Sequence, residues 1–373
     1  MNQPARVLWL IKGLGPGGAE RLLVSLARAH DRRRVELAAA YVLPWKEALV
    51  PELEAAGVRV SCLGGERGAA DPRWIARLHR LLREEHFDIV HSHSPLVASV
   101  ARAVVRTMPK RSRPALVTTE HNAWSTFAVP TRVINALTAP ADDLSLAVSE
   151  QARSSMWWPR LRGRTEVVVH GVDVDAIRAA AASRTAVRGE LGAGDGDVVA
   201  VTVANYRRQK AWPVLLAAAR RALDAAPALR FAGVGQGPLA AEVEAEHARL
   251  GLGDRFVLLG ARDDVPRILA AGDLFVLASS YEGYPVAVME ALAAGLPVVA
   301  TGVPGIADAV RDGVEGVLVP AGDATALAEA VVCLVDDPAR RASFAAAAGR
   351  RGQEFGVDRV ARLLEDRYAA FVR

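Results

Sequence analysis

Two acidic side chains near a glycine-containing turn are the most chemically suggestive feature of the sequence. Residues 279–295 lead from an apolar strand, through a turn that contains Glu282, into a helix expected to begin at Pro285 and end at Gly295. The free N–H groups and positive dipole at the start of that helix favour a phosphate. Glu282 and, further along the helix, Glu290 can accept hydrogen bonds from sugar hydroxyls. The stretch therefore predicts a site that holds both a phosphate and a sugar.

A glycine-rich turn follows the apolar strand expected at 7–11. Its residues 13–18 fit the G-x-G-x-x-G spacing that is typical of dinucleotide-binding folds. The acid that binds ribose in those folds is missing, because the second strand ends at Leu43-Pro44. We therefore favour a turn whose backbone N–H groups approach one phosphate or a sugar over a nicotinamide or flavin site.

Cations follow the first strand of the second half of the chain. The segment 205–210 contains Arg207 and Lys210 and precedes a helix. The planar fork of an arginine and the point charge of a lysine would neutralise a diphosphate, whereas the alternative is a solvated loop without a ligand. The next strand ends in a second glycine turn, 233–237, which allows a ligand to approach the backbone closely.

Histidines follow two neighbouring strands. His91 and His93 end one of them, and His121 follows the other, so all three are expected at the carboxyl ends of strands. A zinc site is disfavoured because no further ligand has a convincing spacing. Structural histidines that bond the loop backbone are one alternative. For His121 we favour a residue that faces the ligand cleft and contacts the sugar or the acceptor.

The pair Asp173 and Asp175 spells D-x-D, which binds a metal and a nucleotide in some transferases. Here it follows 169–171 at the expected crossing between domains. Capping of a helix by Asp173 or Asp175 explains the pair better, so no metal ligand is predicted.

Short apolar strands and helices alternate along the chain, and this predicts parallel sheets covered on both faces. Strands are expected at 7–11, 35–43, 58–63, 88–91, 115–119, 143–149 and 166–170, and again at 198–203, 229–233, 255–259, 274–278, 297–301 and 316–320. Helices are expected at 19–29, 47–56, 72–85, 96–107, 213–225, 238–250, 265–270, 287–294, 325–335 and 358–371. Residues 173–196 show no clear strand and are interpreted as the crossing plus a helix.

Length and composition fit a two-domain globular protein. The chain has 373 residues, of which 51% are hydrophobic and 24% charged. Its two cysteines, Cys62 and Cys333, encode no disulfide framework, so a reducing compartment is expected. The sequence shows no signal peptide and no apolar run of the roughly 20 residues that span a bilayer. A cytoplasmic location is therefore expected.

Charge is unevenly distributed. Residues 1–165 hold 24 Lys/Arg against 15 Asp/Glu, a difference of +9, which leaves 22 against 27 of the chain's 46 and 42, or −5. A basic first half could steer an anionic ligand or contact an anionic membrane. Well-solvated helix faces in an arginine-rich sequence are the alternative.

Together these sequence motifs resemble those of glycosyltransferase family 4, whose members are retaining enzymes with the GT-B fold. The resemblance covers nearly the whole chain and is carried by the turn at 15–20, the loop at 209–210, the turns at 233–238 and Gly260, and above all the run 279–298. It implies an α/β protein of two Rossmann-like, doubly wound domains facing a central cleft. The acceptor domain would comprise 1–172 plus 358–373, the donor domain would comprise 173–357, and the final helix would cross back to the first domain.

The resemblance also implies site residues. Glu290 would hold the ribose hydroxyls, Glu282 the hydroxyls of the donor sugar and Lys210 a phosphate, while His121 would lie near the leaving oxygen. The other residues placed at the donor are Gly15, Gly17, Gly18, Asn205, Gly235, Arg262, Gly283, Tyr284, Pro285 and Val286. No metal is implied, and no cofactor beyond the nucleotide-sugar, which is a co-substrate.

One position departs from the family pattern. The family commonly has Gly-Arg five residues ahead of the lysine, where this sequence has Ala204-Asn205. Arg207, two residues further on, is the candidate substitute for the missing phosphate-binding arginine. With His121, Glu282 and Lys210 it completes the predicted catalytic group.

The predicted reaction moves a glycosyl group from a nucleotide-sugar, with UDP as the first choice of nucleotide, to an acceptor hydroxyl. The resemblance favours retention by front-side attack, with the departing phosphate accepting the proton. A retaining glycosidase, which also uses two carboxylates, and a non-catalytic nucleotide-sugar sensor are the alternatives.

Aromatic residues next to cations suggest the acceptor. The segments 156–164, 124–127 and 110–113 have the composition of a membrane interface, so a lipid-linked or cell-envelope glycan acceptor is expected, at the inner face of a membrane. The alternatives are core packing of Trp157 and Trp158 and a soluble small-molecule acceptor. No nucleic-acid partner is expected, because no binding module accompanies the charge.

Overall fold

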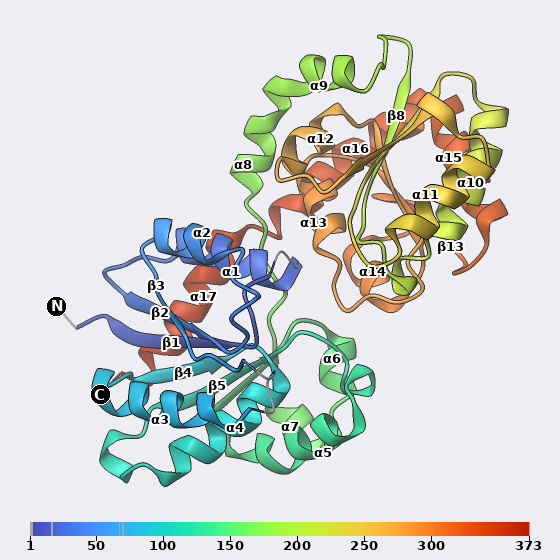
Figure 1. Cartoon of the computed structure of the whole chain (residues 1–373). Coiled ribbons are helices and arrows are strands. Elements are labelled where there is room, and N and C mark those ends of the chain that lie inside the picture. Colours follow the sequence, from blue (N-terminus) through green and yellow to red (C-terminus); the bar gives the residue numbers. More distant parts are fainter. Residues whose placement is uncertain (1–2, 16–17, 67, 69–70, 373) are drawn as a thin grey trace. The chain divides into compact units, whose positions relative to one another are not determined.

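Two compact units make up the chain in the computed structural model, which describes residues 3–15, 18–66, 68 and 71–372 (Figure 1). Unit 1 comprises Met1–Gly171 and Val357–Arg373, and unit 2 comprises Val172–Gly356. Each is an α/β domain built on one parallel sheet. The sequence predicted this class of fold.

Unit 1 contains a seven-stranded sheet in the order β3-β2-β1-β4-β5-β6-β7, in which every pairing is parallel. Its strands are β1 (Ala5–Ile11), β2 (Val35–Tyr41), β3 (Arg59–Cys62), β4 (Ile89–Ser92), β5 (Ala115–Glu120), β6 (Leu144–Ala147) and β7 (Glu166–Val167). All seven expected strands are present, although β7 ends at Val167 and not at His170.

Helices cover both faces of this sheet. They are α1 (Gly18–Ala29), α2 (Val50–Ala55), α3 (Arg73–Glu85), α4 (Pro95–Thr107), α5 (Val129–Thr138), α6 (Glu150–Ser154), α7 (Pro159–Arg164) and α17 (Val357–Ala369), with 3₁₀ turns at Lys110–Ser112, Trp124–Thr126 and Ala139–Ala141. Side chains of β1 alternate between two cores, because successive residues of a strand point to opposite faces. Val7, Trp9 and Ile11 join the core under α1, α2 and α17, whereas Leu8 and Leu10 join the one under α3 and α4.

The carboxyl-terminal helix α17 belongs to unit 1. In Figure 1 it is red and lies among the blue elements at the start of the chain. Ala361, Leu364 and Tyr368 recur at helical spacing and are buried in the core that contains β1. The expectation that the final helix crosses back to the first domain is confirmed.

Unit 2 contains a six-stranded sheet in the order β10-β9-β8-β11-β12-β13. Its strands are β8 (Val198–Val203), β9 (Leu229–Val234), β10 (Phe256–Gly260), β11 (Leu274–Leu277), β12 (Val298–Thr301) and β13 (Gly316–Val319). All six were expected. β8 and β11 form the centre and are almost wholly buried, which explains their continuous apolar sequences.

Helices of unit 2 also cover both faces of its sheet (Figure 1). They are α8 (Val174–Ala179), α9 (Arg184–Glu190), α10 (Trp212–Ala225), α11 (Ala240–Arg249), α12 (Val265–Ala271), α13 (Val286–Ala293), α14 (Pro304–Ala309), α15 (Ala324–Asp336) and α16 (Pro338–Gln353), with 3₁₀ turns at Ala180–Ser183, Arg208–Lys210 and Gly253–Arg255. The crossing therefore holds two α-helices joined by a 3₁₀ turn, where the sequence indicated one helix.

Both sheets reverse their strand order at one point. In unit 1 the reversal lies between β1 and β4, and in unit 2 between β8 and β11. Loops that leave the carboxyl ends of such strands run in opposite directions, and this opens the space where ligands bind in doubly wound sheets. In unit 2, Lys210 follows β8 and Glu282 follows β11, so both lie at this point.

Candidate functional site

A lysine and a glutamate meet at the reversal point of unit 2. The Nζ atom of Lys210 lies 2.5 Å from Oε1 of Glu282, and the Ser279 hydroxyl donates to the same oxygen over 2.6 Å. Glu282 is 6% exposed and Lys210 17%, so this ion pair is largely removed from solvent. The structure thus brings together two of the four predicted catalytic residues.

Backbone contacts hold the two loops of this pair against each other. The Ser280 N–H donates to the Gln209 carbonyl over 2.8 Å, and this ties the loop after β11 to the one after β8. The Thr301 hydroxyl at the end of β12 donates to the Ser279 carbonyl over 2.5 Å. The position of Lys210 relative to Glu282 is therefore set by the sheet.

Gly305, in the first turn of α14, packs directly on the turn that carries Glu282. A Cβ atom at this glycine would lie 2.5 Å from the carbonyl oxygens of both Glu282 and Gly283. No side chain fits there, because real contacts of that length essentially never occur. Sequence reasoning missed Gly305, whose only signal was its place in Pro304-Gly305, shortly after the strand that ends at Thr301.

The predicted glycine turn after β9 packs against the loop after β8. A Cβ at Gly235 would lie 2.3 Å from the Ala204 carbonyl oxygen, and one at Gly237 would lie 2.6 Å from that of Tyr206. Asn205 lies in this loop and is half-buried. The glycines thus permit close approach of two backbones, in addition to any approach by a ligand.

The other predicted donor residues lie around the same edge. Pro285 directly precedes α13, which begins at Val286, between the two starts expected from the sequence, 285 and 287. Glu290 lies in this helix and is half-buried, and Gly295 follows its end with φ of +76°. The Tyr284 hydroxyl lies 3.5 Å from the Asp308 carbonyl, and burial raises the pKa of Tyr284 to about 12.

Two predicted cations differ in their surroundings. The Arg262 guanidinium donates two hydrogen bonds to Asp264, over 2.7 and 2.8 Å. The Arg207 side chain is exposed, and no hydrogen bond or ion pair joins it to another residue in the described part of the chain. Arg207 is therefore available to a ligand, whereas Arg262 is engaged by a carboxylate.

The glycine turn of unit 1 is described only in part. Gly15 follows β1 and Gly18 is the first residue of α1, but Gly17 lies outside the described residues. The Leu14 N–H donates to the Lys46 carbonyl over 2.7 Å, so the turn is fastened to the segment after β2.

Four histidine rings form a continuous cluster in unit 1. His121 lies between His93, 3.2 Å from ring nitrogen to ring nitrogen, and His170, 3.1 Å away. The ring of His91 lies beside that of His93, with 4.2 Å between ring centroids and 34° between ring planes. Its own nitrogens contact the Tyr368 hydroxyl at 2.6 Å and the Thr119 hydroxyl at 2.7 Å. His91 therefore bonds side chains, not the loop backbone as one alternative held.

Burial keeps these histidines neutral. Desolvation lowers the pKa of His121 to about 4 and that of His91 to about 3, and it places the pKa values of His93 and His170 well below their ordinary range. Neutral His121 donates through one ring nitrogen and accepts through the other, which satisfies its contacts with His93 and His170, whereas Nε2 of His93 has no hydrogen-bond partner among the described residues. Among the described residues, no group of three or more His, Cys, Asp or Glu side chains is arranged to hold a metal ion.

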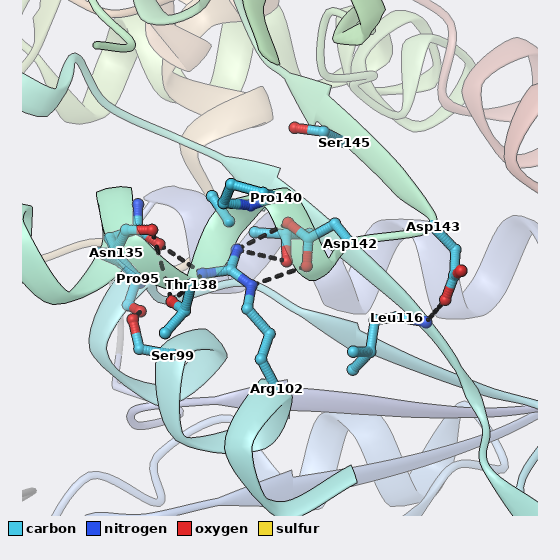
Figure 2. Close-up of polar contacts among 12 residues, drawn as sticks. Pro95, Ser99, Arg102, Leu116, Asn135, Thr138, Pro140, Asp142, Asp143 and Ser145 are labelled. Atoms are coloured by element: carbon cyan, nitrogen blue, oxygen red, sulfur yellow. Dashed lines mark hydrogen bonds and ion pairs between the residues drawn. The ribbon is translucent and has the colours of Figure 1, made fainter. Parts of the chain in front are cut away.

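A buried polar network contacts β5, where the Arg102 side chain donates to the Thr118 hydroxyl over 3.1 Å. Figure 2 shows the Arg102 guanidinium between Asp142 on one side and Asn135 and Thr138 on the other. It donates to both carboxylate oxygens of Asp142 over 2.7 Å, to Asn135 Oδ1 over 2.7 Å and to Thr138 over 3.0 Å. Sequence reasoning missed this network, because its members lie on separate elements.

Two further expectations are resolved by the structure. The Asp173 carboxylate accepts from the Ala176 N–H over 2.9 Å and caps α8, so the capping interpretation is confirmed. Trp157 and Trp158 are 47% and 46% exposed, so the alternative that they pack in the core is wrong.

In the described part of the chain, no helix has the length and apolar character that a membrane span requires.

Solved structures with the same architecture define the class of the fold. HepE from Anabaena, solved with UDP and glucose, matches 97% of this chain and 99% of its own at 22% identity, with a TM-score of 0.84. Sucrose-phosphate synthase from Thermosynechococcus elongatus matches 98% of each chain at 19% identity, with a TM-score of 0.78. The fold of two doubly wound domains is GT-B.

Family models and relatives identify the family within that class. The model of Glycosyltransferase Family 4 matches residues 16–176, and that of Glycosyl transferases group 1 matches residues 197–337. A D-inositol 3-phosphate glycosyltransferase from Geodermatophilus obscurus is 34% identical over 319 residues, which span 78% of this chain and 69% of the relative. The chain belongs to glycosyltransferase family 4, as the sequence motifs indicated.

Other relatives have different acceptors in their names. A 2-deoxystreptamine glucosyltransferase from Streptomyces kanamyceticus is 34% identical over 202 residues, 53% of this chain, and the match spans about half of that relative, 52%. A UDP-Gal:alpha-D-GlcNAc-diphosphoundecaprenol alpha-1,3-galactosyltransferase from Escherichia coli is 26% identical over 286 residues, 72% of this chain and 71% of the relative.

Proposed function

We propose that this protein transfers a sugar from a UDP-sugar to an acceptor hydroxyl, with retention at the anomeric carbon and without a metal ion. The observation that carries the proposal is the Lys210–Glu282 pair at the reversal point of the second sheet. It combines a cation for a phosphate with a carboxylate for sugar hydroxyls at the place where doubly wound sheets bind nucleotides.

The pair also supports a mechanism. A diphosphate next to Lys210 competes with Glu282 for the ammonium group, and the released carboxylate can then accept hydrogen bonds from the donor sugar. Ser279 keeps one hydrogen bond to Glu282 during this exchange, so the carboxylate remains oriented. Lys210, Arg207 and the amino end of α13 would then stabilise negative charge on the departing phosphate.

The proposed chemistry balances without a protein nucleophile. The bond between the anomeric carbon and the donor phosphate oxygen breaks, and the acceptor oxygen forms a new bond on the same face of the sugar. The acceptor proton passes to the departing phosphate oxygen, so nucleoside diphosphate leaves protonated on that oxygen. The roles of His121 near that oxygen and of Glu290 at the ribose remain predictions from the family resemblance.

UDP is favoured by the names of similar proteins. The HepE structures contain UDP, UDP with glucose, or UDP-glucose, and the Escherichia coli relative is named for UDP-Gal. For the acceptor, a lipid-linked or envelope glycan is supported by the two exposed tryptophans of unit 1. A soluble cyclitol is the second candidate, because two relatives are named for D-inositol 3-phosphate and 2-deoxystreptamine.

A thermal-shift panel of UDP-, GDP- and ADP-sugars followed by product analysis tests the proposal. We expect UDP-sugars to raise the melting temperature most, and NMR of the product to show the anomeric configuration of the donor. Turnover should persist in excess chelator. An inverted product, or sugar release without any nucleotide requirement, would refute the proposed reaction.

Two variants distinguish the role of Lys210 from that of Arg207. Lys210→Ala should lower kcat/KM by about a thousandfold, because it removes charge stabilisation of the leaving phosphate. Arg207→Ala should lower donor affinity and turnover if Arg207 replaces the arginine missing at Asn205. Unchanged kinetics in Arg207→Ala beside inactive Lys210→Ala would exclude Arg207 from the site.

A further inference from the structure

Helix α5 in unit 1 carries its apolar residues on the outside. Val129, Val133, Ile134 and Leu137 are 61%, 38%, 43% and 71% exposed. Three of them recur every four residues and the fourth adjoins them, so they form one face of the helix. A helix on the surface of a globular domain ordinarily turns such a face toward the core.

The polar side of α5 faces inward and fixes this orientation. Asn135 is fully buried, accepts from Arg102 over 2.7 Å and donates to Glu120 over 2.7 Å (Figure 2). The Thr138 hydroxyl accepts from the same guanidinium over 3.0 Å. Rotation of the helix to bury its apolar face would leave the Arg102 and Glu120 side chains with unsatisfied buried groups, at a cost of about 1–3 kcal/mol or more for each.

Two tryptophans extend the apolar face. The Trp158 indole N–H donates to the Ala136 carbonyl over 2.8 Å, which holds the ring beside α5. The Arg132 guanidinium on α5 lies 5.5 Å from the ring centroid of Trp157. Both rings are nearly half exposed. We call the set formed by Val129, Val133, Ile134, Leu137, Trp157 and Trp158 the α5–tryptophan surface.

The chain segments that carry this surface bear charges of one sign. Residues 121–141 and 154–165 contain Arg132, Arg160, Arg162 and Arg164 and no Asp or Glu. The acidic residues that border these segments are engaged elsewhere, Asp142 by Arg102, Asp143 by the Leu116 N–H, Glu150 by Arg153 and Glu166 by Arg367. A second copy of the chain in a two-fold dimer would oppose these arginines to themselves, and the repulsion disfavours that occupant. A partner with an apolar interior and a negatively charged surface fits both the apolar face and its surroundings.

We propose that the α5–tryptophan surface docks on an anionic lipid bilayer, with α5 lying in the headgroup region. Indole rings favour the boundary between water and hydrocarbon, and arginines favour anionic headgroups. The inference rests on unit 1 alone and does not depend on the proposed reaction.

Vesicle flotation of the full chain tests the proposal without any donor or acceptor. We expect the protein to float at low salt with phosphatidylcholine vesicles that contain phosphatidylglycerol, and much less with phosphatidylcholine alone. Val129→Gln with Leu137→Gln should weaken binding about tenfold or more, because it removes two apolar side chains from the contact. Val314→Gln, which changes an exposed valine of unit 2, is the matched control and should bind normally.

The charge contribution has its own variant. Arg160→Gln should weaken binding to anionic vesicles about fivefold and reduce its salt dependence, whereas Arg80→Gln on α3 should have no such effect. Far-UV circular dichroism and the thermal shift with UDP check that every variant is folded. Failure to float with anionic vesicles, equal binding to neutral vesicles, or dimerisation abolished by Leu137→Gln would each overturn the proposal.

Discussion

The ion pair between Lys210 and Glu282 affects how a loss of activity on substitution of either residue is interpreted. Removing one partner of a buried ion pair commonly destabilises a protein, because the other charge is left unpaired. Here the pair is largely removed from solvent, and in Lys210→Ala the Glu282 carboxylate would keep the hydrogen bond from Ser279. Loss of activity in Lys210→Ala therefore reports on the reaction where circular dichroism and the melting temperature show that the variant is folded.

Glu120, at the end of β5, gives a prediction on pH and stability. Burial raises its pKa from the ordinary 4.5 to about 7. The folded protein therefore holds this proton more tightly than the unfolded chain, and stability falls as pH rises between about 4.5 and 7. Glu120→Gln removes this charge, so its free energy of unfolding relative to the wild type should rise by roughly 3 kcal/mol from pH 4.5 to pH 8.

Urea unfolding at a series of pH values measures the difference in free energy of unfolding between Glu120→Gln and the wild type. Comparing this difference at two pH values cancels any effect of the amide side chain that does not depend on pH. Glu36→Gln, which changes an exposed side chain near the start of β2 that pairs with Arg6, is the control and should show a much smaller difference over the same range. A Glu120→Gln variant that follows the wild-type pH dependence would show that Glu120 is ionised normally in the folded protein.

At the scale of elements, the first turn of α14 and the turn at 282–283 must fit together. Gly305→Ala places a methyl group against two backbone carbonyls, so the Glu282 turn must shift. We expect donor affinity to fall about tenfold or more, which isothermal titration with UDP-sugar measures. Alanine has a higher helix propensity than glycine, so the substitution should not weaken α14 itself. The expected loss of affinity would therefore come from displacement of the Glu282 turn.

Gly302→Ala is the matched control, because a Cβ there meets nothing closer than 3.6 Å and the residue lies three positions earlier. It should keep wild-type affinity. Equal affinities in the two variants would mean that the position of the 282–283 turn does not govern donor binding.

Every strand among the described residues could be predicted from sequence, but some helices could not. Strands such as β8 are buried on both faces, so their apolar runs are unmistakable. Helix α5 was missed because its apolar face is exposed and its buried side is polar, the reverse of the usual pattern. Helix α16 was missed because its alanines and arginines give only a weak periodic signal, although Asp337 caps it.

The candidate site was also predicted only in part. The carboxyl ends of strands could be located from local pattern, which is how Lys210 and Glu282 were placed at one edge. Contacts between distant segments could not be predicted, because no local pattern encodes them. His91 bonds Tyr368, 277 residues away, and Arg102 of α4 bonds Asn135 of α5, Thr118 of β5 and Asp142.

At the scale of the whole molecule, stability and donor binding can be examined separately in the two units. Unit 1 is completed by α17, whose Leu364 is buried beside the core of β1, and unit 2 carries the predicted donor residues after β8 and β11. A defect in one core should therefore be separable from ligand binding in the other unit, and hydrogen exchange by mass spectrometry can localise both along the chain.

Leu364→Ala should increase exchange in peptides of unit 1, because the cavity costs about 2–5 kcal/mol. UDP should slow exchange in unit 2 near 205–210 and 279–290, and it should do so equally in the wild type and in Leu364→Ala. Leu363→Ala, on the half-buried side of the same helix, should cause a smaller loss. UDP protection that disappears with Leu364→Ala would mean that donor binding needs unit 1 intact, as it would if Gly15, Gly17 and Gly18 of unit 1 contribute strongly to the predicted donor site.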